Sequence, residues 1–224
     1  MTPSRQSATF GPAHWTPAQE KGAWLKELVT SGDGGSFTLL RLDRGAETEV
    51  IGPGDGRILV LEGEITVSGT GERHLTGAYV SLPDSPGRVT APDQAALVLV
   101  LRGHRLGSAT ADVFSPDGWT QSSPGLWFRL LLDVAFGEDF DERIVGVSYI
   151  EPGSSAPRHP HATAHRFLFL EGEADDEMVF PDGTRQTAHR VKGDFVDYPF
   201  PIQHQTFSRT GCTILFVHEP TTVR

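Results

Sequence analysis

The chain has 224 residues, enough for one large domain or for two of about 100 residues each. It carries 29 acidic and 19 basic side chains, a net charge of −10, which argues against nucleic-acid binding because that requires clustered Lys and Arg. No apolar run approaches the roughly 20 residues of a membrane span, and no polybasic run would hold the chain on a membrane surface. The single cysteine, Cys212, excludes an intramolecular disulfide. Together with a start that lacks the apolar core of a signal peptide, this favours a cytoplasmic location.

Short runs rich in Val, Leu, Phe and Thr alternate with Gly and Pro at turn positions, which is typical of an all-β sandwich or barrel. In chain order these runs are SFTLLRL (36–42), RILVLEGEITV (57–67), AALVLVLR (95–102), RFLFLEGE (166–173) and CTILFVHEP (212–220). The best helical candidate, Thr16–Leu28, is interrupted by Gly22, so we predict a turn that leads into a strand there.

The sequence repeats itself. Arg57–Glu64 reads RILVLEGE and Arg166–Glu173 reads RFLFLEGE, and further on TGAYVSLPDSP (76–86) aligns with KGDFVDYPFPI (192–202). A small difference in spacing between the two matches is expected in hairpin loops, where length variation is tolerated. We therefore predict two tandem all-β domains.

Four histidines in the second copy are spaced for a common site. His159 and His161 stand two residues apart, so on a strand both side chains leave the same face. His165 follows four residues later, close enough to return to the same pocket, and His204 comes from a different strand pair. Imidazoles that converge from separate strands suit a divalent metal such as Zn, Cu, Fe or Ni.

This spacing resembles the two sequence motifs of the cupin superfamily. The first motif, usually G(x)5HxH(x)3–4E(x)6G, runs here from Gly153 to Gly172. The second, usually G(x)5PxG(x)2H(x)3N, runs from Gly193 through His204 to Ser208, which stands in the asparagine's place. The chain departs from the pattern at Pro201, which replaces a turn glycine, and at His165, which stands where most cupins have a glutamate ligand. The resemblance implies two tandem double-stranded β-helix (jelly-roll) barrels and one divalent metal, whose identity among Fe, Zn, Ni and Mn this departure leaves open.

A nearer resemblance is to the cupin domains of ChrR-type anti-sigma factors. It rests on a tryptophan segment, WLKEL (24–28), on a strand with the sequence TLLRLDRGAE (38–47), and on SRTGCTIL (208–215). Those regulators hold a sigma factor through a helical zinc domain with an HxxxCxxC motif, and nothing in this sequence matches that motif. The resemblance therefore implies the fold and a metal rather than anti-sigma activity.

The first copy lacks the histidines. Aligning the copies puts Val50, Gly52 and Gly56 in place of the first three histidines and Arg88 in place of His204. We predict that residues 1–104 form a degenerate barrel without metal ligands, which supports the fold or a homodimer interface. Residues 115–224 are predicted to form the metal-binding barrel, with the linker between residues 104 and 115. Arg88, inside an otherwise apolar barrel, is a candidate ligand for a carboxylate.

Neutral imidazoles on a divalent ion can leave positions open for a substrate and dioxygen. Together with the resemblance to cupins that have all-histidine sites, this favours a non-haem dioxygenase for a small diketone or hydroxy-ketone. Phe167 and Phe169 follow His165 at strand alternation, and with Tyr198 they are the predicted lining of an apolar pocket. His218, like the other remaining histidines, is expected to be a surface or packing residue.

The alternative is a non-catalytic sensor or regulatory cupin. Four protein ligands can close a tetrahedral zinc completely and leave no position for a substrate. An isomerase of the sugar-epimerase kind is less favoured, because those cupins usually use a His–Asp pair without a metal. No arrangement for nucleophilic catalysis is evident, and Cys212, in an apolar closing strand, is expected to be buried rather than reactive.

Overall fold

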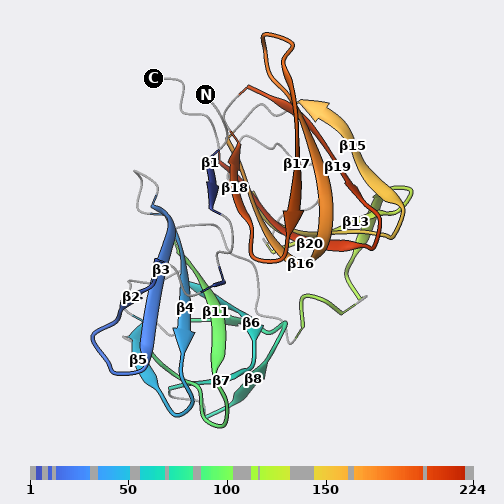
Figure 1. Ribbon diagram of the computed structural model, residues 1–224. Helices are drawn as coiled ribbons and strands as arrows, with labels where there is room; N and C mark the ends of the chain where they lie inside the picture. Colours follow the sequence, from blue (N-terminus) through green and yellow to red (C-terminus); the bar gives the residue numbers. More distant parts are fainter. Residues whose placement is uncertain are drawn as a thin grey trace. The chain divides into compact units, whose positions relative to one another are not determined.

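The computed structural model describes residues 4–6, 10–11, 14–30, 35–50, 56–68, 71–82, 87–102, 112–115, 117–131, 144–160, 164–198 and 201–219. Every regular element in these ranges is a β-strand, so the all-β prediction is confirmed (Figure 1). Within the same ranges no helix is long and apolar enough to cross a membrane. The chain divides into an N-terminal unit, His14–Pro116, and a C-terminal unit, Met1–Ala13 with Asp117–Arg224.

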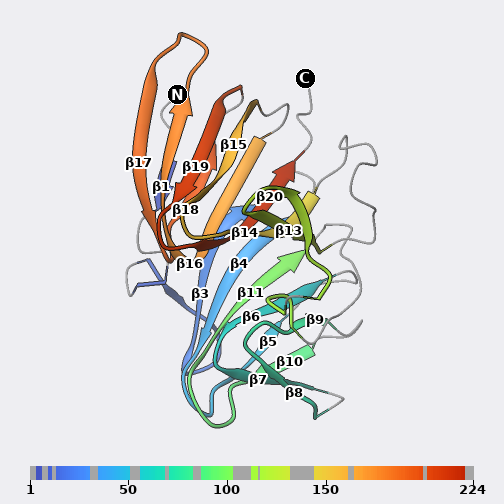
Figure 2. The same ribbon diagram turned by 90° about the vertical axis from the view of Figure 1, so that its right-hand side faces the viewer.

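The strands of the N-terminal unit are β2 (Thr16–Pro17), β3 (Ala23–Thr30), β4 (Ser36–Leu42), β5 (Glu47–Val50), β6 (Arg57–Glu62), β7 (Glu64–Val67), β8 (Arg73–Leu75), β9 (Tyr79–Ser81), β10 (Gly87–Thr90) and β11 (Ala96–Arg102). They form a six-stranded sheet, β2-β3-β4-β11-β6-β9, and a four-stranded sheet, β5-β10-β7-β8 (Figure 2). Apolar residues at alternate positions of both sheets, such as Leu40, Val98 and Val67, pack into one core.

The turn predicted within Thr16–Leu28 is confirmed. β2 and β3 pair antiparallel across a turn, and Gly22 adopts a φ of +81° immediately before β3 begins. Glycine takes this left-handed conformation without steric cost, which explains why the apolar pattern here gives a turn and a strand and not a helix.

The strands of the C-terminal unit are β1 (Ser4–Gln6), β12 (Thr120–Ser123), β13 (Leu126–Leu130), β14 (Ile144–Ile150), β15 (Ser154–Pro160), β16 (Ala164–Val179), β17 (Arg185–Val191), β18 (Phe195–Tyr198), β19 (Gln203–Ser208) and β20 (Cys212–Glu219). The main path of their sheet is β1-β18-β16-β20-β14-β13-β12, while β15 pairs with β19, and β17 and β19 both pair with β16 (Figure 1). The sheet therefore curls back on itself into a nearly closed barrel.

β1 comes from the start of the chain but joins the C-terminal unit. It pairs antiparallel with β18, with Ser4 opposite Asp197 and Gln6 opposite Phe195. Residues 1–13 thus group with the second copy, although the sequence repeat assigned them to a first domain over residues 1–104. A repeat pattern cannot show which sheet edge a three-residue strand will cover, because any open edge offers backbone partners. Residues 104–111 of the predicted linker lie outside the described residues.

β16 supplies both sides of the barrel because it bends in the middle. Its first half pairs with β18 and β20 and its second half with β17 and β19. The bend falls at Gly172, whose φ is +72° and where a Cβ would lie 2.0 Å from the carbonyl oxygen of Gly211. Only glycine fits such a position. The bend turns His165, before it, and Asp176, after it, toward one interior.

Cys212 belongs to the buried core of the C-terminal unit. Burial raises the pKa of its thiol to about 11, so the thiolate is not populated at neutral pH. The prediction that this cysteine is buried is confirmed.

Candidate metal centre

A cavity of about 570 Å³ lies inside the C-terminal barrel, within the size range of small-molecule sites. Its walls come from β12, β13, β14, β15, β16, β19 and β20, and the lining side chains are predominantly apolar. Four histidines from four strands also line this cavity: His159, His165, His204 and His218. His161 lies outside the described residues.

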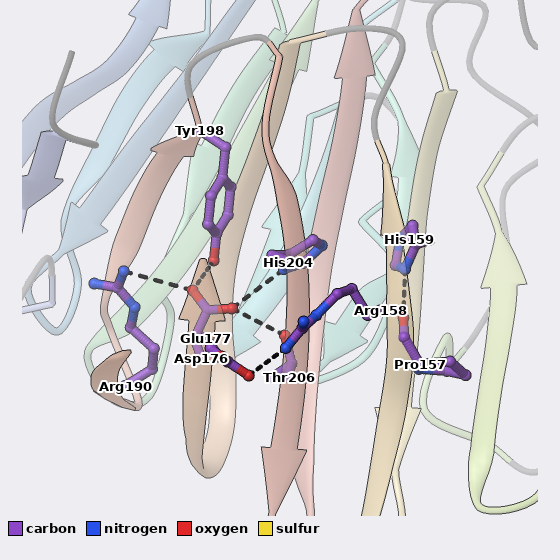
Figure 3. Close-up of polar contacts among 9 residues, drawn as sticks. All are labelled: Pro157, Arg158, His159, Asp176, Glu177, Arg190, Tyr198, His204 and Thr206. Carbon is purple, nitrogen blue, oxygen red and sulfur yellow. Dashed lines mark hydrogen bonds and ion pairs between the residues drawn. The ribbon is translucent and has the colours of Figure 1, made fainter. Parts of the chain in front are cut away.

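His159 and His204 lie side by side on adjacent strands of the barrel wall. They are direct partners in the antiparallel pairing of β15 with β19, and their ring centroids are 5.1 Å apart. The Nδ1 atom of His159 lies 2.6 Å from the carbonyl oxygen of Pro157, so Nδ1–H donates there and Nε2 carries the lone pair (Figure 3). Loss of solvation lowers the pKa of His159, which favours the neutral ring, although the residue as a whole is exposed to solvent.

His204 is almost completely buried and is oriented by a carboxylate. Its Nδ1 atom lies 3.1 Å from Oδ1 of Asp176, which is 0% exposed (Figure 3). The same carboxylate accepts a hydrogen bond from the hydroxyl of Tyr198 and another, 3.2 Å long, from Oγ1 of Thr206. The Arg190 guanidinium, also buried, lies 3.5 Å from Oδ2. Nδ1–H of His204 therefore points at Asp176, and Nε2 carries the lone pair.

The charge of Asp176 is maintained by these partners. Burial raises the pKa of Asp176, but the hydrogen bonds from His204 and Tyr198 and the nearby Arg190 outweigh it, and the net pKa lies below the usual value. Burial and the adjacent carboxylate raise the pKa of Tyr198 well above its usual range, so its hydroxyl stays protonated. A buried carboxylate with this many partners is a typical feature of a functional site.

His165 and His218 form a second pair of rings. They are direct partners in the pairing of β16 with β20, with ring centroids 3.3 Å apart and planes inclined at 38°. The His165 ring lies 6.2 Å from that of His204. Burial lowers the pKa of His218 to about 3, with His159 and His204 adding to the effect, so His218 is neutral at physiological pH.

His218 differs from the expectation that it is a surface or packing residue, because it lines the cavity. The signal that identifies it is strand alternation: Ile214, Phe216 and His218 leave the same face of β20, and all three line the cavity. Asp176 was not singled out by the sequence either. It lies 28 residues before His204, in a part of β16 that matches no motif.

The residues predicted to line the pocket divide into two groups. Phe167 lines the cavity, whereas Phe169 and Tyr198 are buried in the core beneath it. Phe169 stands on the same face as Phe167 but deeper in the barrel, where core side chains cover it. The Tyr198 hydroxyl, expected at the pocket, instead donates to Asp176.

The donor atoms fit a divalent metal in chemistry. Imidazoles that are neutral and hold their Nδ1–H on a backbone or carboxylate oxygen present Nε2 as a ligand, and such ligands suit zinc, iron and nickel. Among the described residues, no group of three His, Cys, Asp or Glu side chains converges closely enough to hold an ion as they stand. His161, the fourth member of the predicted set, lies outside those residues.

The corresponding strands of the N-terminal unit are β5 and β10. Val50 stands opposite Gly87 there, as His159 stands opposite His204 in the C-terminal unit. The register thus puts Gly87, and not Arg88, at the position of His204. Arg88 is also not inside the barrel: its side chain is 48% exposed and forms an ion pair with a glutamate of β5. A one-residue shift in alignment reverses the face of a strand residue, which explains the difference.

Residues 113–222 match the family model described as the ChrR Cupin-like domain. No curated protein sequence matches the chain significantly. Among solved structures, the oxalate decarboxylase of Lactobacillus farciminis, in a formate complex, shares 15% identity at a TM-score of 0.66, covering 96% of this chain and 86% of that one. The Bacillus subtilis oxalate decarboxylase, solved in work on its Mn(II) centres, shares 15% at 0.62, covering 94% and 76%. A cupin 2 conserved barrel domain protein from Leptotrichia buccalis shares 13% at 0.61, covering 91% and 92%.

At these identities the likeness to solved structures concerns the fold alone. It extends over both units, since each of the three alignments covers more than nine tenths of the chain. The family match covers the unit that carries the histidine cavity. Residues 113–222 therefore form a ChrR Cupin-like domain, and the chain as a whole has the fold of the cupin proteins it resembles.

Proposed function

We propose that the C-terminal unit binds one divalent metal ion through His159, His161, His165 and His204. The observation that carries this proposal is the buried pair of His204 and Asp176 at the wall of an apolar cavity. Histidines that bind metals commonly donate their second ring N–H to a carboxylate, which fixes the tautomer and makes the other nitrogen a better ligand. Iron, zinc, nickel and manganese are the candidates for the ion.

We infer that the loaded site is catalytic and acts as a non-haem dioxygenase on a small diketone or hydroxy-ketone. A divalent metal with open positions would supply a Lewis acid and a site for dioxygen. The chain itself supplies Phe128, Phe167 and Phe216, which line the cavity and would hold the carbon body of the substrate away from water. His218, a neutral imidazole in the same lining, can donate a hydrogen bond to a substrate oxygen.

The side chains of the cavity support a ketone over a dicarboxylate. Apart from the proposed metal ion, its described lining residues include no Lys or Arg, so the second carboxylate of a dicarboxylate would find no cationic side chain there. Oxalate, the substrate named for two of the structural neighbours, is therefore disfavoured for this chain.

The second candidate is a regulatory or sensor cupin with a structural or signalling zinc. It is favoured by the match of residues 113–222 to the ChrR Cupin-like domain. In this alternative the histidines close a tetrahedral zinc, and no position remains for a substrate. A cytoplasmic location and a homodimer, both predicted from the sequence, belong to either proposal.

Elemental analysis of the purified chain, followed by oxygen uptake, separates the two candidates. We expect about one equivalent of metal per chain, and after iron loading we expect oxygen consumption that depends on an added β-diketone or hydroxyacetophenone. Each turnover should consume one O2 and place both oxygen atoms in the products of carbon–carbon cleavage. Oxalate serves as a parallel substrate, for which no turnover is expected.

The matched variants are His204→Ala and His189→Ala. His189 is 56% exposed and bonds to Asp175 outside the cavity, so its loss should leave metal content unchanged. Tightly held zinc without oxygen uptake under any metal loading would favour the regulatory candidate. Equal metal content in both variants would contradict the metal site itself.

A further inference from the structure

The N-terminal unit has a cavity of its own, of about 440 Å³, which the proposed function does not use. It is bordered by residues of β2, β3, β4, β5 and β11: Thr16, Leu25, Glu27, Thr38, Leu40, Thr48, Glu49, Val50, Val100 and Arg102. Leu40, Val50 and Val100 belong to the apolar core, so the cavity reaches the interior of the unit.

Arg102 occupies the place in this unit that His218 has in the other. Leu101 pairs with Arg57, as Val217 pairs with Arg166, and the two arginines begin the repeated segments RILVLEGE and RFLFLEGE. The next residue along each strand is therefore Arg102 in one unit and His218 in the other. Both line a cavity, so the same fold position carries a guanidinium in one unit and an imidazole in the other.

The surroundings of Arg102 leave its charge poorly compensated. Its Nε atom is buried and meets no hydrogen-bond acceptor in the part of the chain that the structure describes. Burial lowers the pKa of Arg102, with no carboxylate acting against it. Arg73, by contrast, is paired with Glu64 and Asp93. Arg102 is partly buried, and a guanidinium has five N–H donors and no acceptor, so its buried part loses hydrogen bonds to water unless an anion meets it.

The other lining residues restrict the charge and the shape of the ligand that this cavity can hold. Thr16 and Thr38 place further hydroxyl-bearing side chains at the cavity, while the hydroxyl of Thr48 already donates to Glu20, at 2.7 Å. Glu27 and Glu49 border the same cavity and would repel a ligand with more than one negative charge. The apolar floor requires a carbon body, and the planar guanidinium fork matches a carboxylate.

We propose that the cavity of the N-terminal unit binds a small organic monocarboxylate with an apolar body, with its carboxylate on Arg102 and its body against Leu40, Val50 and Val100. An aliphatic acid and an apolar α-amino acid share this chemistry. The amino acid differs from the acid by its ammonium group, which can donate hydrogen bonds to the carboxylate of Glu27 or Glu49. The site is separate from the histidine cavity, because all of its lining residues belong to the N-terminal unit.

Calorimetric titration of the full chain tests this proposal with 4-methylpentanoate, leucine and 4-methylpentanamide. The amide keeps the shape of the acid without its charge. We expect at least one of the two carboxylates to bind and the amide to bind at least roughly tenfold more weakly, a difference of about 1.4 kcal/mol. Stronger binding of leucine than of the acid would assign a role to Glu27 or Glu49.

Variants then locate the binding. Arg102→Gln should weaken carboxylate binding at least tenfold. Arg102→Lys keeps the charge without the planar guanidinium fork, so its affinity should lie between those of the parent chain and Arg102→Gln. Arg88→Gln and His204→Ala should bind as the parent does, whether or not the second unit holds a metal. The proposal is overturned if neither carboxylate binds, if acid and amide bind equally, or if His204→Ala abolishes binding. Ligand protection of Arg102 from phenylglyoxal, read by mass spectrometry on the parent chain, gives the same answer should Arg102→Gln fail to fold.

Discussion

The two units build the same paired strands from different side chains. Where the C-terminal unit has His159 opposite His204, the N-terminal unit has Val50 opposite Gly87. His159 and His204 line the cavity of their unit and Val50 lines the cavity of the other, so the difference concerns chemistry and not architecture. It shows that the strand pattern specifies the fold, while a few positions around the cavity specify what the fold can bind.

A second difference concerns the buried residues beside the first pair. Asp176 stands opposite Thr206 in the C-terminal unit, and Val67 stands opposite Val89 in the N-terminal unit. Val67 and Val89 pack into an apolar core, where their burial needs no hydrogen-bond partners. A buried carboxylate at the same position is stable only with several partners, and its main partner is the histidine of the candidate site.

The largest effect is expected from removing the histidine pair that distinguishes the two units. The double variant His159→Ala with His204→Ala should reduce bound metal from about one equivalent to near zero, because it deletes both facing imidazoles. Mass-spectrometric metal analysis after dialysis measures this, with His189→Ala as the control. Full occupancy in the double variant would contradict the assignment of the metal to these two histidines.

Replacing the carboxylate comes next. Asp176→Asn should weaken metal binding by about 10- to 100-fold, because it no longer holds His204 in one tautomer. It should also lower the free energy of unfolding by about 3–5 kcal/mol, since it leaves Arg190 buried without its counter-charge. Chelator competition and urea denaturation give the two values.

Thr206→Val is the matched control for Asp176→Asn. It removes one 3.2 Å hydrogen bond from the same carboxylate and keeps its charge, so the expected loss is about 1 kcal/mol of stability with little change in affinity. Equal effects of the two variants on affinity would contradict the orienting role of Asp176.

The acid sensitivity of the histidine cavity is a smaller effect. The pKa of His218 is about 3 in the folded chain against about 6.5 in an unfolded chain. Between these values the unfolded state binds the extra proton, so the contribution of neutral His218 is complete above pH ~6.5 and is lost as the pH falls. Without metal, the parent should lose up to about 1.4 kcal/mol more per pH unit than His218→Gln. Urea denaturation at a series of pH values measures this difference. Equal pH dependence of the free energy of unfolding in the parent and in His218→Gln would contradict the prediction.

The smallest effect is expected at Arg88, the residue that sequence alignment placed opposite His204. Its ion pair is half exposed, so Arg88→Gln should change the free energy of unfolding by less than about 1 kcal/mol. Metal content should stay the same. A large loss of metal would mean that Arg88, contrary to the register of β10, takes part in metal binding.

The sequence alone predicted the all-β fold, because alternating apolar runs and turn glycines are local signals that each strand carries by itself. It also predicted that His159 and His204 belong to one site, through motif spacing. Gly172 shows why such spacing is informative: a left-handed φ and a carbonyl within 2.0 Å of a would-be Cβ leave no other residue possible there.

Asp176, His218 and Arg102 were identified by the tertiary structure. Each lies on a strand whose own sequence reads as ordinary β-structure, and each acquires its role from partners on other strands. The pairing register decides those partners, and a shift of one residue would turn each side chain to the opposite face. Local patterns thus determined which segments are strands, whereas long-range pairing decided which polar side chains face the same cavity.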